Sequence, residues 1–133
     1  MILYLIRGLP GSGKSTYAKK MLTENPNSVH LEADMFHMKR GKYAWHGSLV
    51  SSAHQWCFEN TGIFLNNGYD VVVSNTFTQL KEMQRYLDLA KELDCEVRVI
   101  RLNANYGSVH NVPPDVIVKM RDRFEDYEGE INV

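Results

Sequence analysis

The stretch Gly8-Leu9-Pro10-Gly11-Ser12-Gly13-Lys14-Ser15 matches the phosphate-binding loop pattern G-x-x-x-x-G-K-[ST] at every defined position. A short apolar run at residues 2–6 precedes it and a predicted helix at 14–24 follows it, so the pattern lies between a strand and a helix. In this setting glycines let backbone N–H groups point at phosphate oxygens, and the helix N-terminus adds positive potential. We therefore predict a nucleoside triphosphate site formed by Gly8, Gly11, Ser12, Gly13, Lys14 and Ser15.

Two side chains of this loop have individual roles in phosphoryl chemistry. The Lys14 ammonium is predicted to bridge the β- and γ-phosphates, and the Ser15 hydroxyl is predicted to bind Mg²⁺. The alternative is an accidental glycine turn before a helix, which the complete match and its strand–helix context disfavour.

Length and composition restrict the kind of protein that this chain forms. Its 133 residues suit one domain, so residues 1–133 should hold a single site. The 15 Lys and Arg against 16 Asp and Glu give a formal charge of −1, which argues against a globally basic protein that coats nucleic acid. No apolar run approaches the roughly 18–20 residues of a membrane span, and the apolar start lacks the features of a signal peptide. We expect a cytoplasmic protein without a membrane partner.

Strand and helix patterns alternate four times along the chain. Short apolar runs predict strands at residues 2–6, 28–32, 69–73 and 95–102. Helical patterns follow them at 14–24, 49–67, 80–91 and from Pro113 onward. This order implies an α/β protein with a three-layer P-loop NTPase fold, in which helices cover both faces of a parallel sheet of about four strands. Because parallel strands end at one edge, a single crevice should collect the loops at 7–15, 33–47, 74–78 and 102–112.

The C-terminal part combines an apolar stripe with an acidic run. The stripe predicts a last helix with Met120 in the core, and its members are Val116, Met120, Phe124 and Tyr127. The acidic run at 125–130 is typical of a solvated end of a chain.

The sequence resembles the small P-loop kinases, a group that includes the kinase domain of bacteriophage polynucleotide kinase, zeta-toxin-like kinases and AAA-type ATP-binding proteins. The resemblance covers nearly the whole chain and rests on the loop through Thr16, on Asp34, on Ser74-Asn75-Thr76 and on Ser108-Val109-His110-Asn111-Val112-Pro113. It implies ATP as the phosphoryl donor with Mg²⁺, and Thr16 among the residues that bind ATP. It also implies that Asp34 contacts the acceptor hydroxyl and that a lid at about 103–112 covers ATP.

Asp34 has the chemistry for that role, because an ionised carboxylate can accept the hydroxyl proton. A weak base suffices, since the transition state of phosphoryl transfer is loose. Ser74 and Asn75 stand where related enzymes have carboxylates near Mg²⁺, so we expect Asp34 to hold a metal-bound water as well. The resemblance also predicts that Asn75→Asp is tolerated or mildly activating. The alternative role for Asp34 is to cap a helical turn at 35–40.

The expected lid contains no arginine, although kinases of this type bring one to the transferring phosphate, where it contributes about 10³ to 10⁵ in rate. His110 is a candidate to donate to ATP from the lid. The substitutes elsewhere in the chain are Arg7, Arg40, Arg101 and Arg121. Of these, Arg40 and Arg121 are the preferred catalytic candidates.

Basic and aromatic residues alternate within residues 36–46, and no Asp or Glu interrupts them. The cations are Lys39, Arg40 and Lys42. This mixture suits the 5′ end of a single-stranded nucleic acid, because bases stack on aromatic rings while cations follow phosphates. The alternative is a surface loop whose aromatics pack into the core and whose lysines are merely solvated.

Together these patterns predict an ATP-dependent phosphotransferase that resembles 5′-hydroxyl polynucleotide kinases. A second hypothesis is a small-molecule kinase that acts on a nucleoside, a sugar or a nucleotide-sugar, which the near-neutral charge favours. A third is an ATP-binding regulatory module without transferase activity, which the missing lid arginine and strand-end carboxylate favour.

Overall fold

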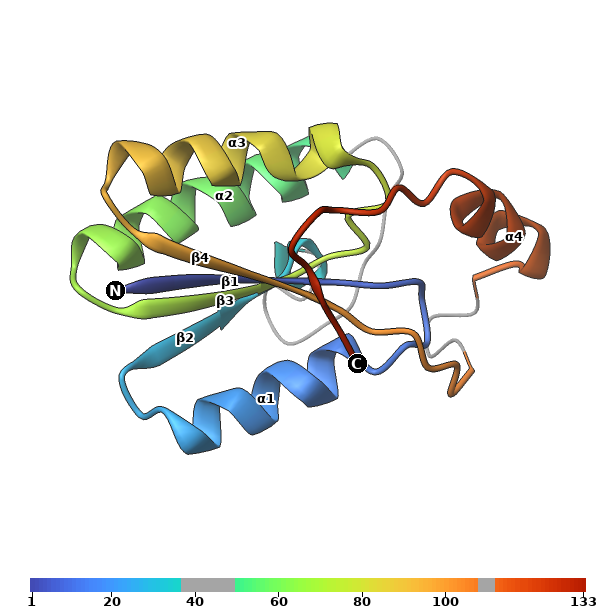
Figure 1. The fold of residues 1–133 in the computed structure, drawn as a ribbon, viewed down its shortest axis with the longest axis horizontal. Coiled ribbons are helices and arrows are strands. Elements are labelled where there is room, and N and C mark those ends of the chain that lie inside the picture. Colours follow the sequence, from blue (N-terminus) through green and yellow to red (C-terminus); the bar gives the residue numbers. More distant parts are fainter. Residues whose placement is uncertain (37–49, 108–111) are drawn as a thin grey trace.

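In the described part of the chain, five parallel strands form one sheet with the order β2-β3-β1-β4-β5 (Figure 1). This computed structural model describes residues 1–36, 50–107 and 112–133. The strands are β1 (Ile2–Arg7), β2 (Ser28–Leu31), β3 (Asp70–Ser74), β4 (Glu96–Arg101) and β5 (Ile131–Asn132). The helices are α1 (Lys14–Glu24), α2 (Val50–Asn66), α3 (Leu80–Glu92) and α4 (Pro114–Asp122).

Helices cover both faces of the sheet, as the alternating pattern predicted. Helices α2 and α3 lie on one face, and α1 lies on the other (Figure 1). Successive side chains of a strand point to opposite faces, so Leu3 and Leu5 of β1 join the core under α2 and α3, whereas Ile6 joins Ala18 of α1. The fold is therefore the expected P-loop NTPase-like α/β fold. In the parts of the chain that the structure describes, no helix is both long and apolar enough to cross a membrane.

The strand register brings the carboxyl ends of the strands to one edge of the sheet. Ile6 of β1 is paired with Ser74 of β3 and with Ile100 of β4. Leu31 of β2 is paired with Val73, one residue earlier on β3. The segments that follow these strands therefore start side by side, which confirms, for the described parts of the four loops, that they gather around a common crevice.

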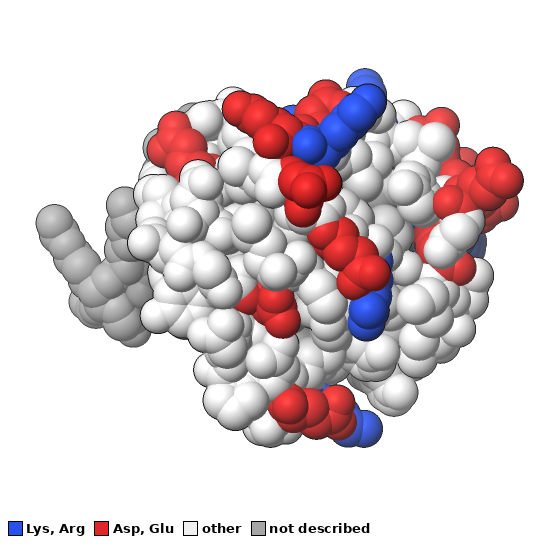
Figure 2. All heavy atoms as spheres, turned by 60° about the vertical axis from the view of Figure 1, so that its left-hand side comes forward, with Lys and Arg blue, Asp and Glu red and all other residues white. Residues whose placement is uncertain are grey.

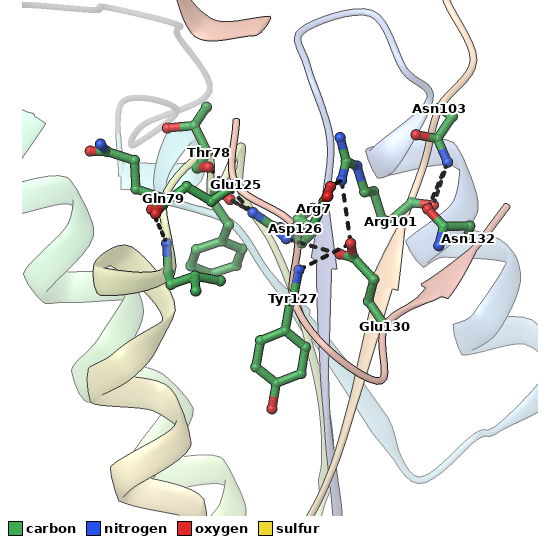
Figure 3. Close-up of polar contacts among 12 residues, drawn as sticks. Arg7, Thr78, Gln79, Arg101, Asn103, Glu125, Asp126, Tyr127, Glu130 and Asn132 are labelled. Carbon is green, nitrogen blue, oxygen red and sulfur yellow. Dashed lines mark hydrogen bonds and ion pairs between the residues drawn. The ribbon is translucent and has the colours of Figure 1, made fainter. Parts of the chain in front are cut away.

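The C-terminal segment adds a fifth strand to the four that the sequence predicted, and it departs from the predicted solvated acidic end at Glu130, whereas Glu125, Asp126 and Glu128 are exposed as expected. Strand β5 pairs in parallel with β4, with Ile131 opposite Ile100. Before it, the Glu130 side chain is only 5% exposed and its Oε1 accepts a hydrogen bond of 2.9 Å from Nη1 of Arg7, a fully buried residue (Figure 3). A strand of two residues is too short to produce a periodic signal, and the partner of Glu130 lies 123 positions away.

The last helix is also shorter and lies elsewhere than the apolar stripe predicted. Helix α4 ends at Asp122 and has no buried residue, so Met120 is not a core residue. Helix α4 lies beyond the carboxyl ends of the strands (Figure 1). Phe124 lies past its end and packs against the guanidinium groups of Arg7 and Arg101, whose carbons are 4.5 and 4.4 Å from the ring centroid. Periodicity identified an apolar face but not the surface that this face would meet.

The buried ion pair yields a stability prediction. Replacing Glu130 with alanine leaves the Arg7 guanidinium buried without its counter-charge, which should lower the free energy of unfolding by about 3–5 kcal/mol. Urea denaturation measures this loss, and Glu128→Ala, at an exposed position of the same segment, is the matched control. Equal unfolding midpoints for Glu130→Ala and the control would contradict the assigned role.

Candidate active site

The phosphate-binding loop connects β1 to α1, and its glycines are required by its shape. Gly11 and Gly13 have φ values of 84° and 87°, in the left-handed region that side chains disfavour. A Cβ on Gly8 would lie 2.5 Å from the Ser12 Oγ and 2.9 Å from the Leu102 carbonyl oxygen, so a side chain does not fit there. Gly8 does not line the cavity beside the loop. The loop residues that line it are Gly11, Ser12, Gly13, Lys14, Ser15 and Thr16.

Lys14 is the cation of this loop. Its ammonium donates to the Leu9 carbonyl oxygen at 3.0 Å. Burial lowers the pKa of Lys14 from 10.5 to about 8, although the charges of Glu32 and Asp34 act in the opposite direction. A buried ammonium gains most from a new anionic partner, so Lys14 is poised for phosphate.

Glu32 is a site residue that sequence patterns did not single out. Its Oε2 accepts hydrogen bonds from the Ser15 hydroxyl at 2.8 Å and from the Ser74 hydroxyl at 2.9 Å. The available signal was its position, one residue after β2 and two before Asp34, since carboxyl ends of parallel strands form ligand sites. The resemblance to small P-loop kinases pointed to Asp34 after β2 and to carboxylates at the end of β3, where this chain has Ser74 and Asn75 instead.

Asp34 lies in a short 3-10 turn at residues 33–36 and lines the same cavity as Lys14 and Glu32. The two carboxylates of the segment after β2 and the Ser15 hydroxyl of α1 thus meet at one site. Within the described residues, no group of three or more His, Cys, Asp or Glu side chains could hold a metal by itself. Any cation here would need ligands from a bound phosphate or from water as well.

Asn75 uses both ends of its amide to secure the segment that carries these carboxylates. Its Oδ1 accepts from the Ala33 backbone N–H at 2.9 Å, and its Nδ2 donates to the Cys57 Sγ at 3.8 Å. The side chain is buried, with 8% of the residue exposed. Burial also raises the pKa of the Cys57 thiol, which keeps this neighbour neutral.

These contacts reverse the expectation for Asn75→Asp. The aspartate would lose the Nδ2 donor and bury a charge beside the segment that holds Glu32 and Asp34, so we expect slower transfer and a loss of about 1–3 kcal/mol in the free energy of unfolding. Steady-state kinetics and urea denaturation measure the two effects. Asn67→Asp, at an exposed position on the chain, is the matched control. If Asn75→Asp is as active and stable as the wild type, the tolerance predicted from the resemblance is right and the structural argument is wrong.

The arginine candidates have different places in the structure. Arg7 donates to the Phe77 carbonyl oxygen from Nε and Nη2 at 3.0 and 2.7 Å, as well as to Glu130. Arg101 binds Asp126 and Glu130 (Figure 3). Both therefore secure the C-terminal segment and do not serve as substitutes for a lid arginine.

Of the two preferred arginines and the lid histidine, the structure describes only Arg121. Arg121 is exposed on α4, where Val116 and Met120 are the residues that line the cavity. One position along a helix turns a side chain by about 100°, so Arg121 projects away from the direction of Met120. Arg40, the rest of the 37–49 segment and His110 lie outside the described residues.

The cavity at this edge of the sheet has a volume of about 1140 Å³. One side carries the polar groups described above. The other side is largely apolar and is formed by Leu102, Ala104, Tyr106, Val112, Pro113, Val116 and Met120. Tyr106 connects the sides, because its N–H donates to the Gly11 carbonyl oxygen at 2.7 Å. A cavity with polar groups at one end and an apolar wall at the other suits a nucleotide.

A glycine loop between a buried strand and a helix, with a lysine and a hydroxyl at the mouth of this cavity, defines a P-loop nucleoside-triphosphate-binding protein. The chain matches a family model described as AAA domain over residues 3–107, which is more than half of its length. The chain belongs to this AAA domain family.

Similar proteins differ widely in size. Human (Homo sapiens) NEDD4-binding protein 2 is 32% identical over 93 residues, which cover 69% of this chain and 5% of the human protein. A chain of the Pnkp1/Rnl/Hen1 complex shares the fold with a TM-score of 0.65 at 22% identity, over 89% of this chain and 38% of that one. A sugar kinase from Janibacter sp. HTCC2649 has a TM-score of 0.69 at 15% identity, over 100% of this chain and 83% of that one. The chain thus spans about a twentieth of the human relative.

Proposed function

We propose that this protein transfers the γ-phosphoryl group of ATP to the 5′-hydroxyl of a polynucleotide, with Mg²⁺ as the accompanying cation. The observation that carries the proposal is the arrangement of Lys14, Ser15 and Asp34 around one cavity: a cation for the phosphates, a hydroxyl for the metal and a carboxylate for the acceptor. Residues 1–133 act as one kinase domain in this proposal.

The donor atoms at the site fit magnesium, because Ser15 and Asp34 present oxygen and Mg²⁺ prefers oxygen ligands while keeping several waters. A cation bound here would supply positive charge that offsets the charge of the phosphates. Ser15 and Asp34 would hold it, the latter through water. Lys14 orients the β- and γ-phosphates, and Asp34 accepts the proton of the acceptor hydroxyl.

The apolar wall of the cavity would receive the base of ATP. Val112 supplies it from the segment before α4, and Val116 and Met120 supply it from α4 itself. The segment at about 103–112 covers ATP in this proposal, and the contact between Tyr106 and Gly11 supports it. Residues 108–111 of that segment lie outside the described residues.

A polynucleotide acceptor is supported by the basic and aromatic composition of residues 36–46, of which the structure describes Phe36 alone. Figure 2 shows the side of the molecule away from α4, where Asp and Glu are more numerous than Lys and Arg. Nucleic acid would therefore approach from the cavity side.

A second candidate is phosphorylation of a small hydroxyl compound such as a sugar. The likeness to the Janibacter sugar kinase over the whole chain favours it, and so does the net charge of −1, which gives no general attraction for a polyanion.

Transfer of label from γ-labelled ATP to a panel of acceptors tests the proposal. We expect label on a single-stranded oligonucleotide with a 5′-hydroxyl, and none on the same oligonucleotide with a 5′-phosphate. Label on a sugar or a nucleoside alone would replace the polynucleotide with a small molecule. ATP binding without transfer to any acceptor would favour the regulatory module instead.

A further inference from the structure

Four polar side chains form one hydrogen-bonded chain across three neighbouring strand ends. The His30 Nε2 lies 2.7 Å from the Ser74 Oγ, and Ser74 and Ser15 both lie within 2.9 Å of the Glu32 Oε2. A carboxylate only accepts, so both hydroxyls donate their single hydrogen to Glu32. His30 must then donate from Nε2 to Ser74, which assigns its tautomer.

The position of Glu32, directly after β2, explains why this site has a glutamate and not a shorter acidic residue. Ser15 follows β1 and Glu32 follows β2, and β3 lies between these two strands. Neighbouring strands are about 4.8 Å apart, so a side chain from β2 must reach past β3 to the phosphate-binding loop. The longer glutamate spans this gap, and Ser74 at the end of β3 supports it halfway.

The distance between the Ser15 and Glu32 oxygens has the size expected for two ligands of one small cation. Adjacent ligands of an octahedral Mg²⁺, each at about 2.1 Å from the ion, lie about 3 Å apart. The observed separation of the Ser15 Oγ and the Glu32 Oε2 is 2.8 Å. Little rearrangement of these two side chains is therefore needed to admit a cation.

We propose that Glu32 is a carboxylate ligand of the divalent cation that accompanies ATP, and that Ser74 and His30 are its positioning residues. The inference rests on the proposed ATP-dependent function and assigns its metal site. In this arrangement β2 supplies the carboxylate, whereas the end of β3 supplies the hydroxyl that orients it. Hydrogen bonds to a ligating carboxylate commonly affect metal affinity about 10- to 100-fold.

The test compares nucleotide affinity with and without the metal. A fluorescent ATP analogue is titrated in Mg²⁺ and in EDTA. The Kd in EDTA divided by the Kd in Mg²⁺ measures the coupling between metal and nucleotide. We expect Glu32→Gln to reduce this ratio at least tenfold while affinity in EDTA stays equal or rises, because a negative charge is lost near the phosphates. Glu59→Gln, at an exposed site on α2, is the matched control.

Two further measurements keep the outcome decisive. Mn²⁺ binding in the presence of ADP, followed by electron paramagnetic resonance, should weaken in Glu32→Gln in parallel. Ser74→Ala leaves the carboxylate in place and should reduce the coupling about tenfold, whereas a merely structural Ser74 would leave it unchanged. Wild-type coupling in Glu32→Gln overturns the inference alone, whereas a wild-type protein that binds no ATP analogue in Mg²⁺ overturns the proposed function.

Discussion

Replacing Lys14 with alanine is expected to abolish ATP binding or phosphoryl transfer and to leave the fold intact. The ammonium lies at the start of α1 beside the cavity, and in the proposed function it offsets phosphate charge during transfer of the γ-phosphoryl group. Removal of one such electrostatic contact typically costs about 10² to 10³ in rate. ATP affinity and turnover measure the loss.

The fold should tolerate this change because the charge of Lys14 is itself unfavourable in the free protein. Burial lowers its pKa to about 8, below the value of an exposed lysine. Below pH 8 the folded protein therefore carries the cost of a buried charge, and alanine removes that cost. Urea denaturation at pH 7 should show a midpoint no lower than that of the wild type. Lys81→Ala, at an exposed position on α3, is the control, and a folded Lys14→Ala protein with normal affinity and turnover would refute the role.

Asp34→Asn is expected to separate transfer from binding. The amide cannot accept the proton of the acceptor hydroxyl, so kcat should fall by about 10² to 10⁴. Lys14 and the loop amides still bind the phosphates, so the Kd for metal-free ATP should change by less than about threefold.

The kinetic and binding measurements are made on the same preparations, with Asp88→Asn as the control on α3. A kcat that survives in Asp34→Asn would remove this carboxylate from the transfer step. A parallel loss of metal-free ATP binding would instead place Asp34 beside the phosphates themselves.

The two carboxylates can have separate roles because they leave the same segment two residues apart. Glu32 extends back to Ser15 and Ser74, whereas Asp34 follows in the turn at 33–36. Asn75 holds the Ala33 N–H between them and so fixes the spacing of both. Loss of metal coupling in Glu32→Gln together with loss of kcat in Asp34→Asn would establish this division.

Local sequence patterns were sufficient for the framework of this protein. The phosphate-binding loop is encoded by consecutive residues, because Gly11 and Gly13 supply the left-handed backbone that the turn requires and Lys14 begins the helix. Alternation of apolar runs with helical periodicity was sufficient for the parallel α/β sheet and for the edge at which its loops meet. Asp34 was singled out by the resemblance to small P-loop kinases, which have an aspartate after the second strand.

Only the tertiary structure decided which distant groups meet. The pairs Ser15–Glu32, Ser74–Glu32 and Arg7–Glu130 are separated by 17, 42 and 123 positions. Periodicity reports which side of an element is apolar, but not what the element packs against, so the stripe on α4 was assigned to the core although Val116 and Met120 line the cavity. Neighbours along the chain determine the backbone conformation and the spacing of apolar residues. The partner of a buried charge is determined only when the sheet has assembled in its strand order.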